Sequence, residues 1–243
     1  MNNSEKEMPF WDHLEELRWC LIKSLFSVLI FSVLSYVNWE FFLKILLIPS
    51  ESMDMHLNLQ VLRITSMFVI KVSCSILLGI IFSLPIISYQ MWSFINPALN
   101  EKFRFSIMFF SIFGSLFFSM GLFFGFFVLI PFSLKFFSGI VSNSFNVEYN
   151  FTLDNYLYFV LWLSFISGLI FQLPVISFYL TRIGLLTTAF LKHYRKYAYL
   201  AFLILGAVLT PPDPFSQIIV AVPLVILYEL SIVISLLYKG SNE

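Results

Sequence analysis

The chain has 243 residues, of which 59% are hydrophobic and only 12% are charged, and its formal net charge at neutral pH is zero. This composition is typical of a protein that crosses a membrane several times, and it gives no reason to expect nucleic acid as a partner. The sequence has no GxxxxGK[ST] phosphate-binding loop and its three histidines lie far apart, so we expect no nucleotide hydrolysis, no metal site, no cofactor and no enzyme activity.

Residues 1–19 are expected to form a helix in the cytoplasmic membrane interface that turns into the first span. Phe10, Leu14 and Leu17 recur at helical spacing, and acidic residues occupy the opposite face. In the first interpretation, which charge alone favours, the acidic face is solvated and pairs with arginine along the helix. In the second, it is a cradle for a cationic peptide, because carboxylates bind guanidinium groups bidentately.

Six apolar stretches follow, and each is expected to be a helix because lipid offers no partner to backbone polar groups. They cover residues 20–37, 67–92, 105–134, 156–180, 197–210 and 216–238. The third is too long for a straight crossing, and Pro131 is expected to kink or end it. The last two helices are expected to be short. The chain is thus predicted to be an all-α protein with six transmembrane helices in a single membrane domain, residues 1–243.

The basic residues predict the orientation of the spans. Ten of the 14 lie on one side: Lys6, Arg18, Lys23, Lys102, Arg104, Arg182, Lys192, Arg195, Lys196 and Lys239. The other four are Lys44, Arg63, Lys71 and Lys135. Because cytoplasmic loops carry the excess of lysine and arginine, both termini are predicted to be cytoplasmic. The long loops 38–66 and 135–155 then face outward.

The turn between the last two spans contains three prolines. Pro211 and Pro212 are expected to end the fifth span, and Asp213 can cap the next helix. The fifth span has 14 residues, which is about 21 Å of helix. A hydrocarbon core is roughly 30 Å thick, so either the membrane is thinned here or the turn is buried among other helices.

Two polar residues stand inside the spans. Counted from the outer ends, Gln172 and Glu229 lie about 24 and 20 Å deep, nearly at one level. An ionisable group within a span is functional by default, because it must face protein or water. The alternative is a hydrogen bond that joins two helices. The sequence leaves both interpretations open.

Several motifs together resemble the TatC family, the polytopic core subunit of the twin-arginine, or Sec-independent, protein translocase. These motifs are His13-Leu14-Glu15-Glu16-Leu17-Arg18, Pro97-Ala98-Leu99, Phe171-Gln172-Leu173-Pro174-Val175 and the run from Leu209 to Gln217, followed by Tyr228-Glu229. They occur in order, at matching spacing, over essentially the whole chain. The resemblance implies a glove-shaped receptor in the bacterial cytoplasmic membrane, or alternatively in an organellar inner or thylakoid membrane.

The resemblance also implies partners and site residues. Partners would be twin-arginine signal peptides of folded cargo, single-span proteins of the TatA and TatB type and further copies of the chain, with transport driven by the proton-motive force. Signal-peptide binding would fall to Glu16, its neighbour Glu15, Phe94 and Glu101, partner docking to Thr210 and Gln217, and a structural role to Pro49. Two positions depart from the family pattern: Phe103 replaces a second signal-binding glutamate, and Gln172 replaces a common glutamate.

Two other classes of function remain open at this stage. A permease for a small molecule or ion would use Gln172 and Glu229 as its site and would be expected to show repeated halves, which the sequence lacks. A membrane assembly factor without a transport role would leave the export of twin-arginine cargo unaffected when deleted.

Overall fold

The computed structural model describes residues 10–51, 58–62, 65–95, 107–135, 150–182, 186–209 and 214–240. All six expected spans contain helix, which confirms the all-α prediction, and the described strands are two of three residues each. In chain order the elements are α1 (Phe10–Val37), α2 (Trp39–Glu51), β1 (Asn58–Gln60), α3 (Ser66–Ile95), α4 (Ile107–Phe124), the π-helix η3 (Gly125–Leu129), β2 (Asn150–Thr152), α6 (Leu153–Ile170), α7 (Leu173–Arg182), α8 (Thr188–His193), α9 (Arg195–Leu209) and α10 (Pro214–Gly240).

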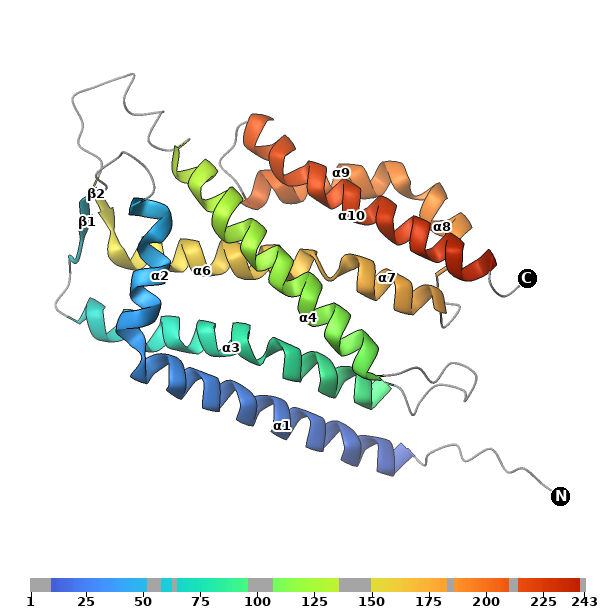
Figure 1. The fold of residues 1–243 in the computed structure, drawn as a ribbon, viewed down its shortest axis with the longest axis horizontal. Helices are drawn as coiled ribbons and strands as arrows, with labels where there is room; N and C mark the ends of the chain where they lie inside the picture. The colour runs from blue at the N-terminus through green and yellow to red at the C-terminus, as the bar shows by residue number, and fades with distance from the viewer. Residues whose placement is uncertain are drawn as a thin grey trace.

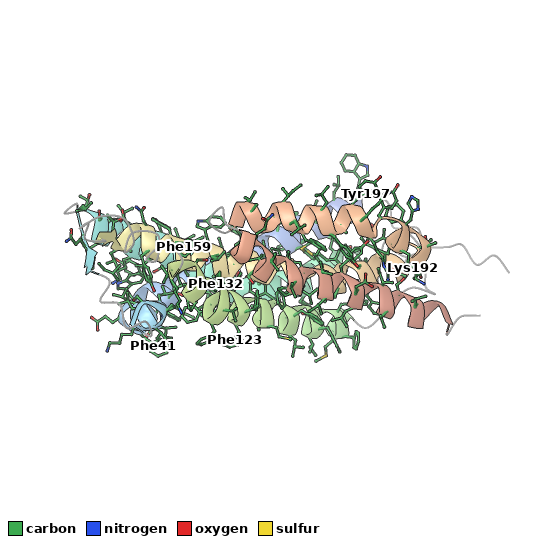
Figure 2. The ribbon with its side chains drawn as sticks, turned by 90° about the horizontal axis from the view of Figure 1, so that it is seen from above. Phe41, Phe123, Phe132, Phe159, Lys192 and Tyr197 are labelled. Carbon is green, nitrogen blue, oxygen red and sulfur yellow. The ribbon has the colours of Figure 1, made fainter. Side chains whose placement is uncertain are left out.

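Helices α1, α3, α6 and α7 run roughly along one direction, α4 slants across them, and α2 stands across one end of the bundle (Figure 1). Helix α1 packs along α3, α4 crosses α6, and α9 and α10 form a hairpin that packs on α7. We call the end with α2, β1 and β2 the α2 end, and the opposite end, where α1 begins and α10 ends, the α8 end. Figure 2 shows Phe41 at the α2 end and Lys192 at the α8 end.

Four helical segments in the described part of the chain are long and apolar enough to cross a membrane: Trp11–Val37, Ser66–Ile95, Met108–Lys135 and Leu153–Thr181. A shorter apolar stretch covers Val220–Val233. Large apolar side chains such as Leu25, Leu29 and Val33 of α1 are exposed on the protein surface. In a bilayer these side chains face lipid, so their exposure carries no penalty.

The first helix differs from the expectation of a separate interfacial helix. Helix α1 is continuous from Phe10 to Val37, with no break near residue 19. The segment contains neither glycine nor proline, so nothing in its backbone favours a turn. Its contact with α3 also extends to the first turns, which keeps the acidic segment in line with the span. Residues 1–9 lie outside the described part of the chain.

Two prolines distort helices in different ways. Pro131 does not end its helix; the distortion lies one turn earlier, in η3, where the Ile130 N–H donates to the Gly125 carbonyl five residues back. Pro174 separates α6 from α7, a break that the sequence did not lead us to expect. Its ring has no N–H to donate and would clash with the carbonyl of Ile170, so the helix is interrupted at the preceding residues.

The two long loops expected outside the membrane contain ordered structure at the α2 end. Helix α2 occupies part of the first loop, and β1 pairs in parallel with β2 of the second loop, with Asn58 opposite Asn150. The hydroxyl of Tyr156, at the start of α6, donates to the Leu46 carbonyl of α2 over 3.0 Å. The two loops are therefore fastened to each other and to the bundle.

The last two helices differ in length. Helix α9 has 15 residues, as expected, but the expectation of a short sixth helix is wrong, because α10 has 27. Helical hydrogen bonding in α10 continues beyond the apolar stretch Val220–Val233 on both sides. In Figure 1 the end of α9 and the start of α10 stop short of the α2 end. This agrees with a locally thin membrane at this hairpin.

Candidate functional site

The candidate site forms where the start of α1 meets the end of α3. The imidazole of His13 stacks on the ring of Phe94, with ring centroids 4.2 Å apart and an angle of 11° between the planes. The Nδ1 atom of His13 lies 3.8 Å from Oε2 of Glu16, three residues along the same helix. His13 thus contacts both Glu16 and Phe94, two residues that were predicted from different parts of the sequence to bind the signal peptide.

Close packing of α1 on α3 holds these residues in place. At Gly79 of α3, a Cβ atom would lie 2.7 Å from the backbone nitrogen and 2.8 Å from the Cα of Ser32, so only glycine permits this approach. Nearer the site, the Cys20 thiol lies 3.5 Å from the Gln90 carbonyl. The pair of helices therefore runs in contact from Gly79 to Phe94, and the site sits at the end of that contact.

The carboxylate of Glu16 has an oxygen atom without a hydrogen-bond donor in the described part of the chain. Its Oε2 atom is buried, yet it has no hydrogen-bond partner among the residues that the structure describes. The contact of 3.8 Å with His13 is too long for a hydrogen bond. The whole side chain remains 39% exposed, so a cationic group can reach it from solvent. A buried acceptor without a donor favours a ligand that supplies N–H groups.

The other proposed signal-binding residues differ in what the structure says of them. Glu15 is exposed on α1, and none of the described residues forms an ion pair with it. Glu101 lies outside the described residues. The structure therefore brings together Glu16, His13 and Phe94, and Glu15 stands beside them on the same turn.

Gln172 and Glu229 do not form a common site in the described part of the chain. The Gln172 side-chain amide donates to the Gly114 carbonyl of α4 over 2.7 Å. Glu229 accepts a hydrogen bond from Arg195 of α9 over 2.7 Å and another from the Tyr199 hydroxyl. Each residue joins a different pair of helices, which supports the interpretation as helix–helix hydrogen bonds.

Of the two proposed docking residues, the structure describes Gln217, which lies on α10 at the α9–α10 hairpin. Thr210, Pro211, Pro212 and Asp213 are outside the described residues. The Gln217 side chain donates to the Leu203 carbonyl over 2.8 Å. A Cβ atom at Gly206 would lie 2.9 Å from the Gln217 carbonyl oxygen, so the two helices touch here. Gln217 therefore sits at the close contact of the hairpin.

Pro49 lies far from both sites, at the α2 end. It is fully buried inside α2. The carbonyl of Leu46, within the same turn, accepts the hydrogen bond from Tyr156. The position agrees with a structural role, in which Pro49 shapes the segment that α6 contacts.

Three residues of these arrangements were not recognised from the sequence as contact residues: His13, Arg195 and Tyr199. His13 lies three residues before Glu16 and hence on the same helical face, which was a usable signal. Arg195 and Tyr199 lie four residues apart on α9, and their approach to Glu229 depends on how α9 crosses α10, which no local pattern encodes.

Comparison with known proteins gives a consistent result. Residues 12–223 match the family model described as Sec-independent protein translocase protein (TatC). The Sec-independent protein translocase protein TatCy of Bacillus subtilis is 36% identical over 231 residues, which cover 94% of this chain and 89% of that protein. TatC of Carboxydothermus hydrogenoformans is 36% identical over 239 residues, covering 97% and 96%.

Solved structures agree with the sequence relatives. A crystal structure of the twin-arginine translocase receptor TatC superposes with a TM-score of 0.78 at 31% identity, covering 93% of this chain and 99% of that one. A second crystal structure of the receptor, in DDM, has a TM-score of 0.80 at 32% identity and covers 92% and 99%. The likeness extends over nearly the whole length of each protein.

Proposed function

Because the chain belongs to the TatC family of Sec-independent protein translocase proteins, we propose that it is the subunit that binds twin-arginine signal peptides and recruits the other translocase subunits. It is a six-helix, multi-pass membrane protein and a transport component rather than a catalyst. We place it in the bacterial cytoplasmic membrane.

The observation that carries the proposal is the unsatisfied carboxylate oxygen of Glu16 beside the stacked rings of His13 and Phe94. A guanidinium group presents N–H donors in a planar fork that matches a carboxylate. Its flat face can also rest on an aromatic ring. A peptide with two adjacent arginines therefore has one side chain for Glu16 and a second for the neighbouring surface, where Glu15 contributes charge. The resemblance to the family adds Glu101 as a further acidic residue for binding. Binding of a twin-arginine peptide, compared with a twin-lysine peptide, tests this proposal.

A permease function is less well supported. Gln172 and Glu229 would need to line one path, yet Gln172 bonds to α4 and Glu229 bonds to α9. The carboxylate of Glu229 is already paired with Arg195 at 2.7 Å, which balances its charge within the protein. Both residues therefore stabilise contacts between helices and do not define a route for a solute.

The distribution of basic residues indicates which end of the bundle faces the cytoplasm, and hence on which side of the membrane the site lies. Arg18 lies on α1 next to the turn that holds Glu16, and Lys192, Arg195 and Lys196 lie on α8 and α9, at the same end of the bundle (Figure 1). We call Glu16, His13 and Phe94 the Glu16 cluster. Since basic residues accumulate on the cytoplasmic side, the α8 end faces the cytoplasm, where signal peptides arrive, and both termini are cytoplasmic.

Cysteine labelling tests this orientation. In a background with Cys20 and Cys74 replaced by alanine, a cysteine at Gln60 should react with an impermeant thiol reagent added outside intact cells. A cysteine at Lys192 should react only after the membrane is permeabilised. Both native residues, Gln60 and Lys192, are exposed, so access depends on the side of the membrane. The reverse pattern would contradict the orientation and the location of the site.

Partner docking is proposed at the α9–α10 hairpin. The α9–α10 hairpin stops short of the α2 end (Figure 1), and a partner helix that carries a polar group into the membrane would meet Gln217 there. The resemblance to the family adds Thr210 as the second docking residue. The partners would be single-span proteins of the TatA and TatB type, with the proton-motive force as the energy source. Further copies of the chain are expected in the same complex.

The double change Thr210→Val and Gln217→Leu should weaken this docking by about 8- to 900-fold, since each of the two interhelical polar contacts contributes roughly 0.6–2 kcal/mol. Crosslinking yield between α10 and a single-span partner measures the effect. Ser119→Ala, which removes an exposed hydroxyl from α4, is the control. Thermal unfolding separates lost docking from a loosened hairpin, because Gln217 also bonds to Leu203. Unchanged crosslinking would refute the docking site.

A further inference from the structure

A cavity of about 410 Å³ opens at the α2 end, where α1 ends, α2 begins and α3 passes beside them. Its walls are residues 37–41 together with Lys44 of α2 and Lys71 of α3. The α1–α2 junction that lines it lies at the lower left of Figure 1, at the opposite end of α1 from Glu16 and away from the α9–α10 hairpin. None of the interactions described above for those two sites uses this cavity.

The charge of the cavity is unbalanced. Two lysines, Lys44 and Lys71, and one acidic residue, Glu40, line it. Among the residues that the structure describes, no carboxylate lies within 4.0 Å of Lys44 or Lys71. The Nζ atom of Lys71 instead lies 4.3 Å from the centre of the Tyr36 ring, which fixes the ammonium group near the cavity wall. The cavity is therefore suited to a group with negative charge.

The depth of the cavity matches the headgroup region of a membrane. The apolar segment of α1 ends at Val37, and Lys71 lies in the second turn of α3, whose apolar segment begins at Ser66. The wall also contains Trp39 and Phe41, and aromatic side chains are typical of the boundary between hydrocarbon and water. Phe41 is 62% exposed, so its ring is available to lipid.

We propose that this cavity binds the headgroup of an anionic glycerophospholipid such as phosphatidylglycerol. The phosphodiester lies between Lys44 and Lys71, the glycerol hydroxyls donate to Glu40, and the acyl chains run along the exposed face of α1. The lipid is held at the junction of three helices and stabilises the α2 end of the bundle. Basic pockets between transmembrane helices are a recurrent form of lipid site.

Native mass spectrometry of the full chain tests the proposal, with the protein released from nanodiscs that contain equal amounts of phosphatidylglycerol, phosphatidylethanolamine and phosphatidylcholine. Phosphatidylglycerol should remain bound in preference to the other two. Each of Lys44→Gln and Lys71→Gln should lower its retention about fivefold, and the double variant about 25-fold, as expected for charges near a membrane surface. Lys135→Gln removes a lysine from the same end but outside the cavity, and should leave retention unchanged.

Three results would overturn the proposal. Retention of phosphatidylglycerol by the double variant at the level of the native chain would show that the lysines do not hold it. Equal retention of the three lipids would remove the requirement for an anionic headgroup. Release of the lipid by inorganic phosphate at millimolar concentration would show that the site takes a free anion. The unfolding temperature in lipid-free detergent should be the same for all variants, which excludes misfolding as the cause.

Discussion

Replacing Glu16 with glutamine should weaken the binding of a twin-arginine signal peptide by about 10- to 150-fold. The change keeps the shape of the side chain but removes the charge, and a hydrogen bond to a charged group contributes roughly 1.5–3 kcal/mol. The affected atom is Oε2, which is buried and has no donor within the described part of the chain. Titration of a labelled peptide into the purified chain in nanodiscs measures the loss.

Glu15→Gln is the matched control for this experiment. It removes the same charge from the neighbouring position, where the side chain is exposed on α1. Its effect should stay below about fivefold, as for other exposed ion pairs. If Glu15→Gln weakened binding as much as Glu16→Gln, net charge on α1 would explain binding and the specific role of Glu16 would be wrong.

Gly79→Ala should destabilise the protein and, through α1, also weaken peptide binding. The new methyl group would lie 2.7 Å from the nitrogen and 2.8 Å from the Cα of Ser32, and backbone atoms cannot rotate away as a side chain can. Overpacking of this kind costs about 1–3 kcal/mol. The two helices would separate, and His13 would move away from Phe94. Unfolding in mixed micelles and peptide titration would report the two effects.

Gly114→Ala provides the comparison, because both changes give a helix the same gain in propensity. A Cβ atom at Gly114 would lie 3.4 Å from the nearest atom, Oε1 of Gln172, which is near ordinary van der Waals contact. This variant should unfold and bind peptide like the native chain. Equal stability of Gly79→Ala and Gly114→Ala would contradict the close packing of α1 on α3.

Much of the bundle could be predicted because membrane spans obey a simple rule. Lipid requires long apolar helices, and the six spans were recognisable on that ground alone. The structure differs from the prediction where a proline or a contact between distant segments determines the local conformation. Pro174 divides the fourth span, although proline is tolerated in many transmembrane helices. The pairing of β1 with β2 joins two three-residue segments that carry no strand signal of their own.

The candidate site was predictable only in part. Glu16 and Phe94 were identified from separate parts of the sequence, and the structure places them together through His13, which belongs to the first motif but was given no role there. Glu229 was recognised as an unusual residue, but its partners on α9 depend on the crossing of two helices. Thr210, Glu101 and the prolines at 211 and 212 fall outside the described residues, so their roles stay predictions.

The most direct test of the central claim compares two peptides on the native chain. Purified protein in nanodiscs should bind a peptide with a twin-arginine motif at least about tenfold more tightly than the same peptide with two lysines, because only arginine offers the planar fork that pairs with the Glu16 carboxylate. Both peptides carry the same charge, so general attraction to an acidic surface contributes equally to the two affinities. Equal affinity for the two peptides would contradict the assignment of the chain as a twin-arginine signal receptor.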